Sequence, residues 1–169
     1  MRLFFALWPS PEAARALGEW AREVQRAAGG RATRDETIHL TLAFLGDAEP
    51  ERAIAAARAV RGEAFELPVD AARYWRRQRI VWAGPAEMPG ALARLVEQLH
   101  ARLAAAGFVL EERPFAAHVT LLRKAGAPGA LPPLPALRWP ADEFVLVRST
   151  PSTLGSRYET AARFRLGRQ

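Results

Sequence analysis

The sequence predicts an α+β fold in which helices alternate with short strands of antiparallel or mixed pairing. Three observations support this prediction. Apolar residues recur at helical spacing in two long segments, short apolar runs rich in Leu, Val, Phe and Thr lie between the helices, and two strand-like segments end the chain as a hairpin. The 169 residues suffice to bury a sizeable core, and we expect a single domain over residues 1–169.

The expected helices are recognised by their end signals and their apolar faces. The first begins at Ser10-Pro11, a typical capping pair, and ends at Gly29-Gly30. A second is expected from Pro50 to about Val60, and a third ends at Gly107. The apolar faces consist of Leu17, Trp20, Ala21 and Val24 in the first helix and Leu92, Leu95, Val96, Leu99 and Leu103 in the third.

The strands are predicted from short apolar runs bounded by turn residues. A basic turn at residues 76–79 separates two of them, and residues 126–140 are rich in Pro and Gly, which indicates a loop. The predicted strands cover residues 2–8, 38–46, 63–75, 79–83, 108–112, 117–124, 142–149 and 157–166.

The composition favours an anionic partner. The formal charge is +6 and the pI is near 11, which makes nucleic acid the leading candidate. An alternative is that an arginine-rich chain with Lys124 as its only lysine reflects a GC-rich genome. The chain has no cysteine, which excludes disulfides and thiolate metal sites. Neither a membrane-length apolar run nor a signal-peptide pattern is found, so we expect a cytoplasmic protein.

Two matching motifs indicate where the chemistry lies. His39 and Thr41 alternate along one predicted strand, and His118 and Thr120 alternate along another. Residues two apart on a strand share a face and lie about 7 Å apart, so each pair can contact one small anion. The two histidines are 79 residues apart, close to half the chain, and a helix closed by glycine precedes each motif. A duplication would bring both strands together across a groove.

Two imidazoles facing one cleft suit phosphoryl transfer. A neutral histidine takes a proton from the attacking oxygen and a protonated one gives a proton to the leaving oxygen, and an ordinary pKa near 6.5 permits both forms. The threonine hydroxyls would hold the phosphate oxygens. Arg123 follows on the same strand, on the face opposite His118 if the strand is regular, and would reach the phosphate if the strand ends or twists.

Other residues fit this chemistry less well. His100 lies beside the leucine stripe of the third helix, where a helix-surface or half-buried role is expected. The sequence has neither a metal-ligand spacing nor a glycine-rich phosphate loop, so we expect no metal and no cofactor. A strand His-x-Thr pair by itself is most often structural.

The paired motifs resemble those of the two-histidine (2H) phosphoesterases, within which the chain is most similar to the RNA 2′,3′-cyclic phosphodiesterases, also called 2′-5′ RNA ligases (ThpR or LigT type). The resemblance runs almost from end to end. It is carried by residues 37–46 and 114–124, which contain the two motifs, and more weakly by residues 2–6, 79–84 and 155–159.

The resemblance implies a bilobal fold, with two pseudo-symmetric lobes that each hold an antiparallel sheet, a motif strand and flanking helices around a central cleft. It implies hydrolysis of RNA 2′,3′-cyclic phosphate ends to 2′-phosphates without metal or cofactor. His39 would protonate the departing 3′ oxygen and His118 would activate water, although the symmetry permits the exchanged roles. Thr41, Thr120 and Arg123 would bind the phosphate.

The same resemblance suggests partners and a second reaction. RNA with cyclic phosphate ends, including tRNA fragments, would be the substrate of a monomeric enzyme, and 2′-5′ ligation would reverse the cleavage. Phe4 or Phe5 could stack on a base, or both could belong to the core, and the turn residues Arg76 and Arg79 could contact the RNA backbone or only solvent. Two alternatives stay open: a non-catalytic RNA-binding module, and a 2H enzyme acting on another phosphodiester such as ADP-ribose 1″,2″-cyclic phosphate.

Overall fold

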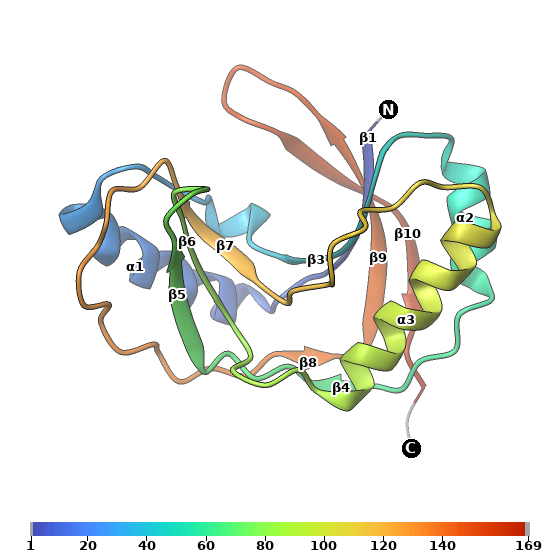
Figure 1. Cartoon of the computed structure of the whole chain (residues 1–169), viewed down its shortest axis with the longest axis horizontal. Coiled ribbons are helices and arrows are strands. Elements are labelled where there is room, and N and C mark those ends of the chain that lie inside the picture. The colour runs from blue at the N-terminus through green and yellow to red at the C-terminus, as the bar shows by residue number, and fades with distance from the viewer. Residues whose placement is uncertain (1, 168–169) are drawn as a thin grey trace.

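The computed structural model describes residues 2–167, and most of its strands form two antiparallel four-stranded sheets (Figure 1). Each sheet contains one histidine-motif strand. The first has the order β10-β9-β1-β3, with β1 at Arg2–Leu7, β3 at Leu40–Asp47, β9 at Glu143–Thr150 and β10 at Arg157–Arg165. The second has the order β2-β7-β6-β5, with β2 at Arg31–Ala32, β5 at Ala71–Trp75, β6 at Ile80–Gly84 and β7 at Val119–Arg123.

Along the sequence the chain crosses from one sheet to the other several times, so neither sheet is built from one half of the sequence. The first sheet joins strands from both ends of the chain, and the second joins β2 to strands from the middle. A small additional pair links β4 (Phe65–Glu66) to β8 (Pro140–Ala141). The predicted α+β class, with a motif strand in each antiparallel sheet, is confirmed.

In the described part of the chain, three α-helices cover the sheets. Helix α1 (Pro11–Ala28) packs against β7 and β2, whereas α2 (Pro50–Arg58) contacts β10 and α3 (Gly90–Ala105) contacts β3. Figure 1 shows α1 on the side of β5–β7 and the other two helices on the side of β9 and β10. The Ser10 hydroxyl caps α1 by accepting from the Ala13 backbone N–H at 3.1 Å. The expected apolar faces of α1 and α3 are buried.

Two strand predictions were wrong in detail. Residues 63–75 contain two strands, β4 and β5, because residues 67–70, which include Pro68, belong to no strand, and the Asp70 N–H donates to the Gly84 carbonyl just before β5 begins. Residues 108–112 form no strand: Phe108 packs into the core and its N–H donates to the Leu103 carbonyl, at the end of α3. Strand β2 was not predicted, since two residues carry no alternation pattern.

None of the helices within residues 2–167 is long and apolar enough to cross a bilayer.

Candidate active site

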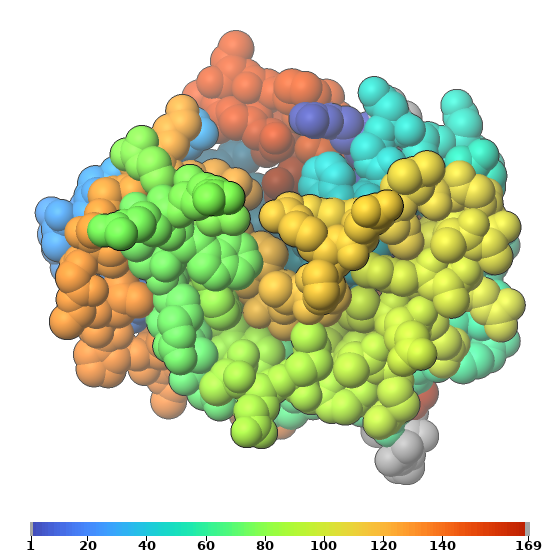
Figure 2. Space-filling view, viewed as in Figure 1, coloured from blue at the N-terminus to red at the C-terminus, as the bar shows by residue number. Residues whose placement is uncertain are grey.

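One cleft of about 1140 Å³ receives side chains from both sheets, and both histidine motifs open onto it. His39 and Thr41 reach it at the start of β3, and His118, Thr120 and Arg123 reach it from β7. In Figure 2 this face is hollowed between the red β9–β10 hairpin and the gold segment that precedes β7. The structure therefore brings the five residues of the two motifs to one cavity.

Each histidine ring is oriented by the backbone two residues before it. Nδ1 of His39 lies 2.7 Å from the Thr37 carbonyl oxygen, and Nδ1 of His118 lies 2.8 Å from the Ala116 carbonyl oxygen. A carbonyl can only accept, so Nδ1 carries the hydrogen and the neutral ring keeps its lone pair on Nε2. Nε2 of His39 lies 2.9 Å from the Thr41 hydroxyl. In both rings Nε2 is therefore the nitrogen left for proton transfer.

Aromatic side chains pack around both imidazoles. His39 contacts Phe4, Trp8 and Tyr158, with ring centroids 4.9, 5.5 and 5.5 Å away. His118 lies 4.6 Å from Trp75 and 6.2 Å from Trp82. These rings pack against both imidazoles and limit the orientations that the imidazoles can adopt.

This environment lowers the pKa of both histidines. Burial is the main cause at His39 and takes its pKa from 6.5 to about 4, against the opposing hydrogen bond to Thr37. Burial also lowers the pKa of His118, against the opposing hydrogen bond to Ala116. The positive charge of Arg123 lowers both values further. Both rings are therefore neutral at pH 7 before an anion enters the cleft.

Each motif strand contains a β-bulge at the same place. In β3, Thr41 pairs with Ala6 and Ala43 with Phe5, so Leu42 is an extra residue. In β7, Thr120 pairs with Trp82 and Leu122 with Val81, so Leu121 is an extra residue. At each bulge two consecutive residues are buried. These are Leu42 and Ala43 in β3, and Leu121 and Leu122 in β7. The bulge thus shifts the alternation of side chains by one position.

This shift explains how Arg123 reaches the cleft. A regular strand would direct it to the face opposite His118, whereas the bulge returns it to the histidine's face, where it lines the cavity. The matching position after His39 is Phe44, which is 55% exposed and also lines the cleft. The two lobes therefore present an arginine and a phenylalanine at equivalent positions.

A donor from a neighbouring element binds the carbonyl of each bulge. Nε2 of His100 in α3 lies 2.8 Å from the Leu42 carbonyl oxygen, and the Thr33 N–H donates to the Leu121 carbonyl at 2.9 Å. The Thr33 hydroxyl also donates to the Thr120 carbonyl at 2.9 Å. His100 is half-buried, as expected, but it also lines the cleft, which the sequence did not reveal.

The aromatic residues expected to contact a base do not reach the cavity. Phe5 is fully buried in the core, and Phe4 is 2% exposed and lies beside the His39 ring. Because neither ring has a free face, the expected base contact of Phe4 or Phe5 is wrong. The Phe, Trp and Tyr side chains that line the cleft are Phe44, Trp75, Phe115 and Tyr158.

Neither Arg76 nor Arg79 of the basic turn lines the cleft. The Arg79 guanidinium donates to the Lys124 and Ala125 carbonyls, both at 3.2 Å, and so joins the turn to the end of β7. Arg76 is exposed and does not line the cavity, whereas Gln78 of the same turn does. The structure thus gives Arg79 a structural contact and leaves Arg76 on the surface.

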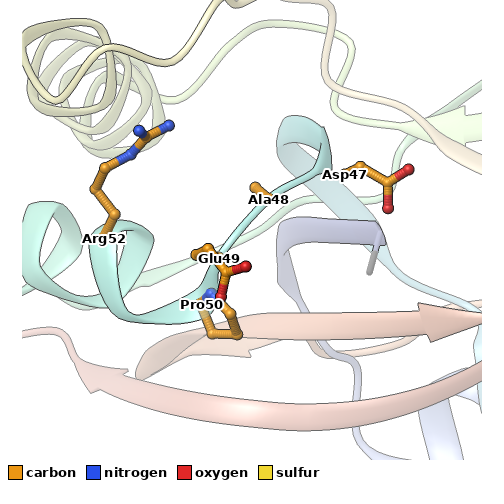
Figure 3. Close-up of a pocket in the computed structure, with 5 residues that line it drawn as sticks. All are labelled: Asp47, Ala48, Glu49, Pro50 and Arg52. Carbon is orange, nitrogen blue, oxygen red and sulfur yellow. The ribbon is translucent and has the colours of Figure 1, made fainter.

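A second, smaller hollow of about 440 Å³ lies at the junction of β3 and α2 (Figure 3). Figure 3 shows the Arg52 guanidinium directed away from the Asp47 and Glu49 carboxylates, and Arg52 packs over the Phe108 ring at 4.4 Å from its centroid. This hollow gathers no convergent set of reactive groups. Within residues 2–167, no group of three or more His, Asp or Glu side chains is placed to hold a metal ion.

The sequence model of the LigT-like phosphoesterase family matches this chain twice, over residues 7–82 and 83–158. The chain belongs to the LigT-like phosphoesterase family. It is 35% identical to the RNA 2′,3′-cyclic phosphodiesterase of Escherichia coli K12, over 98% of this chain and 96% of that protein. It is 34% identical to the protein of the same name from Thermus thermophilus, over 98% of this chain and 90% of the relative.

The fold agrees with that of a solved LigT-like phosphoesterase. The crystal structure of E. coli LigT complexed with 3′-AMP superposes with a TM-score of 0.89 at 33% identity, over 98% of this chain and 97% of that one. Each of the two matches to the LigT-like phosphoesterase family contains one His-x-Thr motif. The repeat seen in the sequence thus corresponds to a duplicated family unit.

Proposed function

We propose that the protein hydrolyses RNA 2′,3′-cyclic phosphate ends to 2′-phosphates by paired histidine acid–base catalysis. The observation that carries this proposal is that two imidazoles, each with its Nδ1–H directed to a backbone carbonyl, share one cleft with Arg123. Family membership and the names of two nearly full-length relatives support the substrate class.

In the proposed reaction, neutral His118 takes a proton from water through Nε2 as the water oxygen bonds to phosphorus. The bond from phosphorus to the 3′ oxygen breaks, and protonated His39 gives its Nε2 proton to that oxygen. The products are a 2′-phosphate and a free 3′-hydroxyl, and the proton taken by His118 restores His39 through solvent. Each proton transfer contributes typically about 10²- to 10⁴-fold in rate.

The remaining motif residues bind the phosphate in this scheme. Arg123 would neutralise the phosphate oxygens, and the Thr41 and Thr120 hydroxyls would donate to them. Because the pKa of His39 is about 4 in the free protein, it must gain its proton together with substrate. The negative phosphodiester supplies the cause, since an anion near an imidazole raises its pKa. Phe44, Trp75 and Tyr158 offer aromatic faces for a base.

The test uses an oligoribonucleotide with a 2′,3′-cyclic phosphate end, in EDTA, with the product identified by phosphorus NMR. We expect a 2′-monophosphate, a bell-shaped dependence of kcat/KM on pH, and losses of at least about 10²-fold in His39→Ala and His118→Ala. His100→Gln is the matched control, because it removes the third imidazole and keeps a donor for the Leu42 carbonyl.

Full turnover in either alanine variant would refute the histidine assignment, and RNA binding without turnover in the wild type would favour the binding-module alternative. Activity lost in EDTA and restored by a divalent ion would refute the metal-free scheme. Replacing water by a ribose hydroxyl would give 2′-5′ ligation through the same two proton transfers, which the same assay measures when an acceptor oligonucleotide is added.

A further inference from the structure

Among the described residues, four arginines line the cleft, and they fall into two classes. Arg34 and Arg113 each form an ion pair with a nearby glutamate. Arg31 and Arg123 form neither an ion pair nor a side-chain hydrogen bond with any residue in the described range 2–167. Two exposed cations of the cleft are therefore left without an acidic partner.

The two unpaired arginines stand directly opposite each other. Strand β2 pairs with β7 in antiparallel register, with Arg31 as the partner of Arg123. Side chains of directly opposed residues lie on the same face, roughly 5 Å apart at their Cα atoms, and like charges in that arrangement destabilise a sheet. An anion bound between the guanidinium groups would remove this repulsion.

The local backbone fixes this arrangement. Gly30, with φ of +83°, passes so close to β7 that a Cβ atom there would lie 2.4 Å from the Arg123 carbonyl oxygen. The Gln25 side chain donates to the Gly30 carbonyl at 2.9 Å, and the Gly126 N–H donates to the Ala28 carbonyl at 2.8 Å. Arg31 is thus held beside Arg123 by contacts that do not use its own side chain.

We propose that Arg31 and Arg123 form a second anion subsite that binds the phosphodiester adjoining the reacting phosphate, so that the cleft prefers RNA ends over isolated nucleotides. This proposal rests on the proposed function. Arg123 is close enough to both catalytic histidines for its charge to lower both of their pKa values, so it borders the reacting phosphate. Arg31 lies one strand farther out and extends the same positive surface to the next phosphate along the chain.

The test compares the affinities for two product-like nucleotides, adenosine 2′-monophosphate and adenosine 2′,5′-bisphosphate, by isothermal titration calorimetry. The added 5′-phosphate stands for the neighbouring phosphodiester. We expect it to improve the wild-type Kd by about tenfold, as for a charge-assisted contact. In Arg31→Gln this gain should fall close to onefold, and Arg31→Lys should keep part of it. Arg58→Gln, an exposed arginine of α2 that does not line the cleft, removes the same net charge as a control.

The salt dependence gives a second readout. Loss of one phosphate contact should make the Kd for the bisphosphate less dependent on salt concentration, with little change for the monophosphate. A 5′-phosphate gain that survives in Arg31→Gln would overturn the proposal, and so would an equal loss of affinity for both nucleotides. No gain in the wild type would also overturn it, while turnover of the cyclic end would leave the proposed function standing. Conversely, a 5′-phosphate gain that depends on Arg31 in a protein without turnover would support the subsite and refute the proposed reaction.

Discussion

The low pKa of His39 predicts a specific dependence of stability on pH. In the folded protein this pKa is about 4, mainly because of burial, whereas in the unfolded chain it returns to about 6.5. Above pH 6.5 the ring is neutral in both states and contributes no pH dependence. Between pH 6.5 and pH 4 the unfolded chain binds a proton that the folded protein does not, so stability falls as the pH falls. Below about pH 4 the loss is complete.

The magnitude follows from the two pKa values. Each tenfold difference in proton affinity corresponds to about 1.4 kcal/mol, so the full loss is about 3 kcal/mol. This is a large share of the roughly 5–15 kcal/mol by which folded domains are stable. The perturbation is His39→Gln, which keeps a polar side chain and removes the titration. Between pH 7.5 and pH 4, the free energy of unfolding should therefore fall by about 3 kcal/mol less in the variant than in the wild type.

The assay is urea unfolding followed by tryptophan fluorescence at several pH values between 4 and 7.5. The pH dependence of His118 is present in both proteins and cancels in the comparison. If wild type and His39→Gln lose stability in parallel over this range, His39 does not remain neutral in the folded state. The reasoning from burial would then be wrong. An NMR titration of the His39 ring gives an independent check.

Three further predictions concern Arg123 and Phe44, which follow the two bulges, and Gly30, which precedes β2. Arg123→Gln removes a positive charge near both histidines of the cleft, so an NMR titration should show both pKa values rising, and kcat should fall; unchanged pKa values would contradict the placement of Arg123. Phe44→Ala should raise KM for the cyclic-phosphate oligonucleotide by about tenfold and change kcat less, because the ring is 55% exposed and can offer a base one face while it stacks on Phe4; an unaltered KM would exclude Phe44 as a base platform. Gly30→Ala should lower the free energy of unfolding by about 2 kcal/mol or more in urea titrations, since its Cβ would meet the Arg123 carbonyl. The control Gly29→Ala, also at positive φ but with no atom within 4 Å of the added Cβ, should cost less than Gly30→Ala.

The features predicted well from the sequence are those set by local patterns. The apolar face of α1, its Ser10 cap and the leucine stripe of α3 follow from side-chain spacing and backbone hydrogen bonding alone, and the structure has all three. The alternation of His39 with Thr41 is likewise a property of an extended chain. Strand β2 was missed because a two-residue strand exists only through its pairing with β7. The separation of β4 from β5 also depends on different partners, β8 and β6.

The two His-x-Thr motifs of the site could be predicted from the sequence. The residues whose position depends on the pairing register of the strands could not. Which of Phe4 and Phe5 faces the cleft could not be read from alternation, and the structure buries both. Trp75 and Tyr158 were missed because their place beside the histidines comes from sheet pairing and from the β9–β10 hairpin. The sequence predicts a helix-surface or half-buried position for His100, and only the contact of α3 with the bulge in β3 shows that this residue also reaches the cleft.

The two bulges show how a duplicated frame acquires chemical asymmetry. Leu42 and Leu121 occupy equivalent positions as extra residues, and each directs the residue five places after its histidine into the cleft. The frame therefore fixes where these side chains lie, but not what they are. At one position Phe44 offers an uncharged aromatic face, and at the other Arg123 carries the charge that lowers the pKa of both histidines. Since both motif strands have a bulge at the equivalent residue, we expect a difference in the order of proton transfer to come from such side chains and from the packing around each ring. Exchanging the two residues in Phe44→Arg/Arg123→Phe would reverse that asymmetry, and it should move the positive charge to the lobe of His39 without altering either bulge.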